Sequence, residues 1–119
     1  MKKILFSFAA VVLFAGLASA QVSGPVVTSA SFLQWDYSTS VTGMKEFRVY
    51  LSRTPAVVPT ATPTATVAFP TLQWPISAAT GQWYAVVTAV TTGDVESTPS
   101  NEVPFFVLEK PANLRVKPD

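Results

Sequence analysis

Histidine and cysteine are both absent from this chain of 119 residues. Without histidine a Ser-His-Asp triad is excluded, and without either residue Cys-His catalysis and most zinc sites are excluded as well. The lack of cysteine also rules out disulfides and a lipid attached through cysteine. We therefore expect a fold held by packing and hydrogen bonds alone, with no catalytic residue, no metal site and no cofactor.

Charge is also sparse, with 8 Lys/Arg against 7 Asp/Glu. Arg48, Arg53 and Arg115 are scattered and form no basic cluster. Nucleic acids are bound largely by neutralising their phosphates, so we expect no nucleic-acid partner. Low charge combined with much Thr, Ser, Val and Pro is typical of exported all-β proteins.

Residues 1–20 have the pattern of a secretory signal peptide. Lys2 and Lys3 precede an apolar run from Ile4 to Leu17, and the run ends in a small-residue cleavage site at Ala20. An uncleaved anchor is the alternative, but the run is shorter than the roughly 20 residues of a membrane span. Cleavage after Ala20 would leave six Lys/Arg and seven Asp/Glu. We expect a secreted, periplasmic or cell-surface protein with no stable membrane insertion after cleavage.

Apolar residues alternate with polar ones in several short segments, which is the period of a β-strand. The alternation runs through Ser31–Asp36 and through Phe47–Leu51, where Phe47, Val49 and Leu51 face one way. Gln82–Thr91 and Glu102–Leu108 are further strand-like segments, and Ala85, Val87 and Ala89 are expected on the inward face of the first of them. Aromatic and β-branched residues are frequent there, which favours strands over helices. Pro104 predicts that the last segment is an edge strand whose amide side faces away from its partner.

The segment from Pro55 to Pro75 is rich in proline, which removes ladder donors. We expect edge strands or extended pieces near Ala56–Val58 and Thr64–Phe69. A disordered linker is the alternative, but apolar residues still alternate from Val67 to Ile76. Short strands separated by turns, with no credible helix, predict a β-sandwich.

Three motifs in order resemble a fibronectin type III domain of the bacterial and phage kind. Leu33-Gln34-Trp35-Asp36 resembles its second strand, and Phe47–Leu51 its third. Glu96-Ser97 and Ser100-Asn101-Glu102-Val103 resemble the end of its last hairpin. The resemblance covers Ser31–Leu108 and implies a seven-stranded, immunoglobulin-like antiparallel sandwich over residues 21–109.

The resemblance departs from the family pattern at one corner, where the family's tyrosine falls on Trp83. A one-residue bulge would let the adjacent Tyr84 act as the corner tyrosine. Otherwise the Trp83 indole substitutes, and its N–H then needs an acceptor of its own.

Residues 110–119 follow the sandwich as a tail or strand-like extension. Pro111–Val116 resembles the family's first-strand phrase, although it stands at the far end of the chain. It is a solvated tail, the opening of a second module, or a strand donated to a neighbouring copy. The third interpretation rests on the alternation of Leu114 and Val116 and on a weakly marked first strand.

The remaining candidate sites are acidic and aromatic side chains. Asp94, Glu96 and Glu102 suggest a weak Ca²⁺ site, an acid/base pair, or a solvated hairpin in which Glu96 and Ser97 cap loop amides. We favour the hairpin. A candidate contact surface comprises Tyr50, Trp74 and Tyr84. Rim packing of the tryptophan and cross-strand pairing of the tyrosines are the alternatives.

We therefore expect an exported, non-catalytic β-sandwich module that binds or spaces other molecules, with a protein or glycan as partner. The alternative is a structural subunit of an extracellular assembly, such as a surface, fimbrial or virion decoration, that self-associates through its C-terminal segment. The fold alone assigns neither role.

Overall fold

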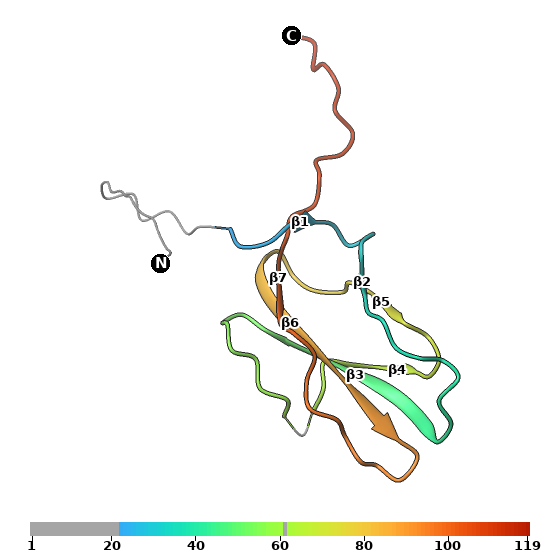
Figure 1. Ribbon diagram of the computed structural model, residues 1–119. Coiled ribbons are helices and arrows are strands. Elements are labelled where there is room, and N and C mark those ends of the chain that lie inside the picture. Colours follow the sequence, from blue (N-terminus) through green and yellow to red (C-terminus); the bar gives the residue numbers. More distant parts are fainter. Residues whose placement is uncertain (1–21, 61) are drawn as a thin grey trace.

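The computed structural model describes residues 22–60 and 62–119, so the predicted signal peptide and the cleavage at Ala20 lie outside the described residues. Every regular element within these ranges is a strand, as Figure 1 shows. The strands are β1 (Val26–Val27), β2 (Phe32–Gln34), β3 (Met44–Ser52), β4 (Ala65–Ala68), β5 (Gln73–Pro75), β6 (Gly81–Thr91) and β7 (Val103–Val107). No helix in this part of the chain is long and apolar enough to cross a membrane.

The strands form two sheets, one of five strands in the order β1-β7-β6-β3-β4 and one made of β2 and β5. Neighbours β3 and β6 are far apart in sequence, and β3, β6 and β7 lie side by side opposite the smaller sheet. This strand order is of the immunoglobulin-like kind. The predicted all-β, seven-stranded architecture of two sheets is confirmed.

The first strand departs from the expected antiparallel arrangement, because β1 pairs with β7 in parallel. The lead into β1 contacts both β6, through Gln82, and β7, through Pro104. Ser23 exchanges two hydrogen bonds of 2.9 Å with the Gln82 side chain. Gly24 has a φ of 76°, and a Cβ there would lie 2.1 Å from the Pro104 carbonyl oxygen. Only glycine permits this close approach.

The core lies between the sheets, where the alternating residues of β3 and β6 meet the smaller sheet. Phe47, Val49 and Ala89 form one buried cluster, packed against Leu33, Trp35 and Trp74 among others. Ile76, Ala85, Phe105 and Val107 form a second cluster, packed against Trp83. The inward register predicted from alternation is therefore confirmed on both long strands.

The outer face of β6 is buried too, which alternation did not predict. Val86, Thr88 and Val90 face away from the smaller sheet and yet are buried. The loop between β3 and β4 is held to this side of the sheet by Glu102. Its carboxylate accepts hydrogen bonds from the amides of Ala56 at 3.2 Å and Val57 at 2.6 Å.

The proline-rich segment contains two short strands, β4 and β5, and only one of the two pieces expected there is a strand. Ala65–Ala68 is an edge strand as expected, since only β3 pairs with it. Ala56–Val58 belongs to no strand, because its backbone amides bind a carboxylate instead of a ladder. In place of the strand or extended piece predicted there, the structure has a loop that is anchored by Glu102.

Pro104 was expected to mark an edge strand, but β7 lies between β6 and β1. The ring nitrogen does face away from β6, because Phe106, of the same parity, donates its amide to Pro25 on the β1 side at 2.9 Å. Only two residues of β1 pair with β7, so no ladder bond is lost at the proline.

At the start of β6, Trp83 occupies the corner position where the resembled family has a tyrosine. Trp83 Nε1 donates a hydrogen bond of 2.8 Å to the carbonyl of Ala79, four residues upstream. The Arg53 guanidinium lies 3.9 Å from the centre of the Trp83 ring. The indole therefore has its own acceptor, which is the second of the two alternatives drawn from the sequence.

The C-terminal segment 110–119 leaves the end of β7 and extends away from the sandwich (Figure 1). It contains no strand, and every residue in it is exposed. Leu114 is 99% exposed and Val116 is 90% exposed.

Candidate binding groove

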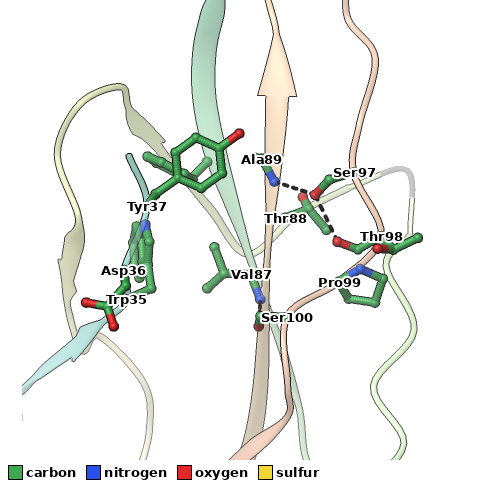
Figure 2. Close-up of a pocket in the computed structure, with 11 residues that line it drawn as sticks. Trp35, Asp36, Tyr37, Val87, Thr88, Ala89, Ser97, Thr98, Pro99 and Ser100 are labelled. Carbon is green, nitrogen blue, oxygen red and sulfur yellow. Dashed lines mark hydrogen bonds between the residues drawn. The ribbon is translucent and has the colours of Figure 1, made fainter. Parts of the chain in front are cut away.

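A groove of about 190 Å³ opens on one side of the sandwich, between the residues that follow β2 and the segment that leads into β7. Figure 2 shows Trp35, Asp36 and Tyr37 on one wall and Ser97, Thr98, Pro99 and Ser100 on the other. Its floor includes Phe47 and the β6 residues Val87, Thr88 and Ala89.

The aromatic wall is built on Phe47. The Trp35 and Tyr37 rings meet Phe47 edge-on, with ring centres 5.4 Å and 5.2 Å away. Such contacts fix ring orientation beyond what burial alone would do. The indole nitrogen Nε1 of Trp35 is buried and has no hydrogen-bond partner among residues 22–60 and 62–119. Buried donors are normally paired, so this indole N–H is an exception within the described residues.

The opposite wall is fixed to β6 by two serines. Ser97 and Ser100 donate their amides to the carbonyls of Ala89 and Val87, each at 2.8 Å. Their hydroxyls accept the amides of the same two residues, at 2.9 Å and 3.0 Å. Each serine thus replaces a full strand partner where β7 has not yet begun. This arrangement explains why the hairpin carries serine at both positions.

A second groove of about 320 Å³ shares Trp35, Asp36, Val87 and Ser100 with the first. It extends along β2 to Leu33 and Gln34, and along the other wall to Asn101 and Val103. The two grooves therefore follow one side of the sandwich, between β2 and the segment that leads into β7.

One edge of β2 borders this groove. On its other edge β2 pairs with β5, where Trp35 donates its amide to Leu72 at 3.1 Å and Ser31 accepts from Ile76 at 2.9 Å. Successive residues of a strand direct their backbone groups to opposite edges, so those of Phe32 and Gln34 face the groove side. No strand within the described ranges pairs with that edge. It is an unpaired sheet edge of the kind that accepts another strand.

The acidic residues of the last hairpin make structural contacts, in line with the favoured interpretation of the sequence. Glu96 accepts hydrogen bonds from Tyr50 at 2.5 Å and Thr88 at 2.6 Å, and its other oxygen lies 3.4 Å from Arg48. The hydrogen bonds from Thr88 and then Tyr50 hold the pKa of Glu96 below its ordinary value. Burial, followed by the bond to Glu96, raises the pKa of Tyr50. Glu96 was expected to cap loop amides, but it binds side chains.

The other two candidate carboxylates, Asp94 and Glu102, bind groups different from those that Glu96 binds. Asp94 is 68% exposed and pairs with Lys45 at 2.7 Å, and that hydrogen bond lowers the pKa of Asp94. Glu102 binds the loop amides described above. Within residues 22–60 and 62–119 there is no group of three or more potential metal-binding side chains.

The candidate contact surface of Tyr50, Trp74 and Tyr84 is not a single exposed patch. Tyr50 is only 3% exposed, so the prediction that it belongs to a contact surface is wrong. Its hydroxyl donates a hydrogen bond to Glu96. Trp74 is half-buried against the core from the smaller sheet. Tyr84 is half-buried on the opposite sheet, between Ser52 and Pro104. Sequence reasoning did not identify the Trp35–Tyr37 wall, because only the folded chain brings both rings onto Phe47.

No family model matches this chain, and no curated protein matches it. Among solved structures, the fibronectin(III)-like modules of Clostridium thermocellum CbhA are similar at 19% sequence identity. The match covers 75% of this chain and 91% of that chain, with a TM-score of 0.48. At this identity and score the likeness does not establish a family. The fold assignment rests on the strand order itself.

Proposed function

We propose that this chain is an exported, non-catalytic β-sandwich module of the fibronectin type III kind, and that it binds an extended polypeptide. The observation that carries the proposal is the groove beside the unpaired edge of β2. Aromatic rings lie on one wall, and serines that are hydrogen-bonded to β6 form the other. Such an edge can add a strand, with main-chain hydrogen bonds giving affinity and neighbouring pockets giving specificity.

The contacts of the acidic residues favour a structural role for them over a catalytic role. Glu96 and Glu102 each accept hydrogen bonds from fixed donors of the protein, which favours an anchoring role over proton exchange with a substrate. Asp94 is engaged by Lys45 on the surface.

A selection from a library of extended peptides, using the chain that begins at Gln21, tests the binding role. The groove variant is Thr98→Trp, which places an indole at an exposed groove wall. The matched control is Val95→Trp, on the exposed tip of the same hairpin. We expect selected peptides to bind wild type and the control equally, and the groove variant about tenfold or more weakly. Failure to enrich any peptide, or equal binding to Thr98→Trp, would refute the proposal.

The export half of the proposal predicts the N-terminus of the mature protein. Expression of residues 1–119 in a bacterial host should yield a processed chain that starts at Gln21, as measured by intact mass. A replacement of Ala18 and Ala20 by bulky residues should block processing, since the cleavage site requires small residues. Recovery of the intact chain from the cytoplasm would contradict export.

A further inference from the structure

The occupant of the groove can be named from the chain itself. We infer that the C-terminal segment of a second copy, residues 112–117, adds as a strand to the unpaired edge of β2. This inference rests on the proposed function, because it uses the same groove and names its partner. It links successive copies head to tail.

The donor segment has the alternation of a strand over residues 114–117 but pairs with no strand in the single copy, where Asn113 has a φ of 57°. Leu114 and Val116 alternate with Arg115 and Lys117, and both apolar side chains are almost fully exposed. An exposed apolar pair at strand spacing gains from burial against another surface. Arg115 hydrogen-bonds only within the tail, to the carbonyl of Asn113 at 3.0 Å. Removing residues 110–119 should therefore leave the sandwich intact.

The acceptor edge matches this segment in pattern. On β2 and its extension, Leu33 and Trp35 face the core, and the exposed side chains of Gln34 and Asp36 lie between and after them. An added strand that places Leu114 and Val116 on the core side would bring them next to these apolar residues. Arg115 would then lie on the outer side, within reach of Asp36 or Gln34.

The backbone groups that face the β2 edge also agree with an added strand that turns Leu114 and Val116 toward the core. The backbone groups of Gln34 face the unpaired edge, and a residue of the parity of Arg115 lies opposite it in an antiparallel pair. Both residues have an amide to donate. Pro118 shares the parity of Leu114 and Val116, and therefore falls on a pair that exchanges no bond across this edge. The proline thus costs no ladder bond.

The direction of the chain assigns the segment to a second copy. The end of β7 and the start of β2 lie together, because the Ser29 amide donates to the Glu109 carboxylate at 2.7 Å. A tail folding back within one copy would thus enter at the start of β2 and run parallel to it. Antiparallel addition requires entry from the other end. The extended tail reaches away from its own sandwich, as Figure 1 shows. Because donor and acceptor are different surfaces, the contact joins copies head to tail, either into a closed ring or into an open chain.

Complementation between two defective variants tests the inference. One variant ends at Glu109 and keeps the groove without the tail. The other is Gln34→Pro, which removes the edge amide and keeps the tail. We expect each to be monomeric by light scattering at concentrations where wild type associates, and their mixture to form a one-to-one heterodimer. A third variant, Leu114→Asp with Val116→Asp, should weaken association about tenfold or more for each side chain without affecting the fold.

Three outcomes would overturn the inference. The first is a wild type that stays monomeric at high concentration, and the second is an aspartate variant that associates as strongly as wild type. The third is a monomer in which Gln34 and Asp36 amide resonances shift when the tail is present, which would place the tail in its own groove. If the peptide selection described above succeeds while complementation fails, the groove binds a different polypeptide and the proposed function stands.

Discussion

The replacement Glu96→Gln probes the contacts on the outer face of the larger sheet most directly. In wild type the carboxylate receives hydrogen bonds from Tyr50 and Thr88, both of which are buried. Glutamine keeps the shape but offers a neutral acceptor, and hydrogen bonds to a charged acceptor are roughly twice as strong as neutral ones. The Glu96 side chain is 27% exposed, so solvent weakens the effect.

We expect Glu96→Gln to lower the free energy of unfolding by about 1–2 kcal/mol at pH 7. For a domain of this size that corresponds to a fall in melting temperature of about 5–10 °C. The difference should depend on pH with a definite sign. Because the folded-state pKa of Glu96 lies below its ordinary value of 4.5, its stabilisation is present above that pH. It is lost as the pH falls through the folded-state pKa.

Thermal unfolding followed by circular dichroism between pH 7 and pH 2 measures both quantities. The gap between wild type and Glu96→Gln should close toward acid, since protonated glutamate and glutamine are then both neutral. Asp94→Asn is the control, because it removes an exposed ion pair on the same hairpin and asparagine tolerates the φ of 64° found there. A constant gap at all pH values, or an equal loss in the control, would refute the reasoning.

Three further changes test other contacts. Trp83→Phe removes the hydrogen bond to Ala79 and should destabilise the fold by about 1–2 kcal/mol in denaturant titration, whereas a neutral result would mean that packing alone holds the corner. Ser100→Ala should speed hydrogen exchange of the Val87 amide by about fivefold or more, since about 1 kcal/mol of local protection is lost. Glu102→Ala should increase protease cleavage in the β3–β4 loop, and unchanged cleavage would show that the loop is held by other contacts.

The alternation of residues along the sequence was sufficient to predict the two long strands and the side chains that they direct into the core. Phe47 and Val49 on β3, and Ala85 and Ala89 on β6, lie in the core as alternation predicted. Alternation is a property of neighbouring residues, because a strand turns successive side chains to opposite faces. The corner at Trp83 was also anticipated as an alternative, and the acceptor at Ala79 satisfies its stated requirement.

The outer face of the larger sheet was not predictable in this way. Tyr50 was expected to be a contact residue, but it is buried and bound to Glu96, which lies 46 residues away in the chain. Glu102 binds amides of a loop at a similar separation. Such contacts depend on which loop returns to which face, and no short-range period encodes that choice.

The sequence by itself therefore determined which residues alternate into the core, that the part of the chain described by the structure is all-β, and that histidine and cysteine chemistry is excluded. The tertiary structure alone decided where the edges lie. It placed the N-terminal lead along β7, left one edge of β2 unpaired within the described residues, and opened a groove beside Trp35. Strand faces follow from local sterics, whereas strand neighbours follow from long-range pairing, so the unpaired edge emerges only once the chain is folded.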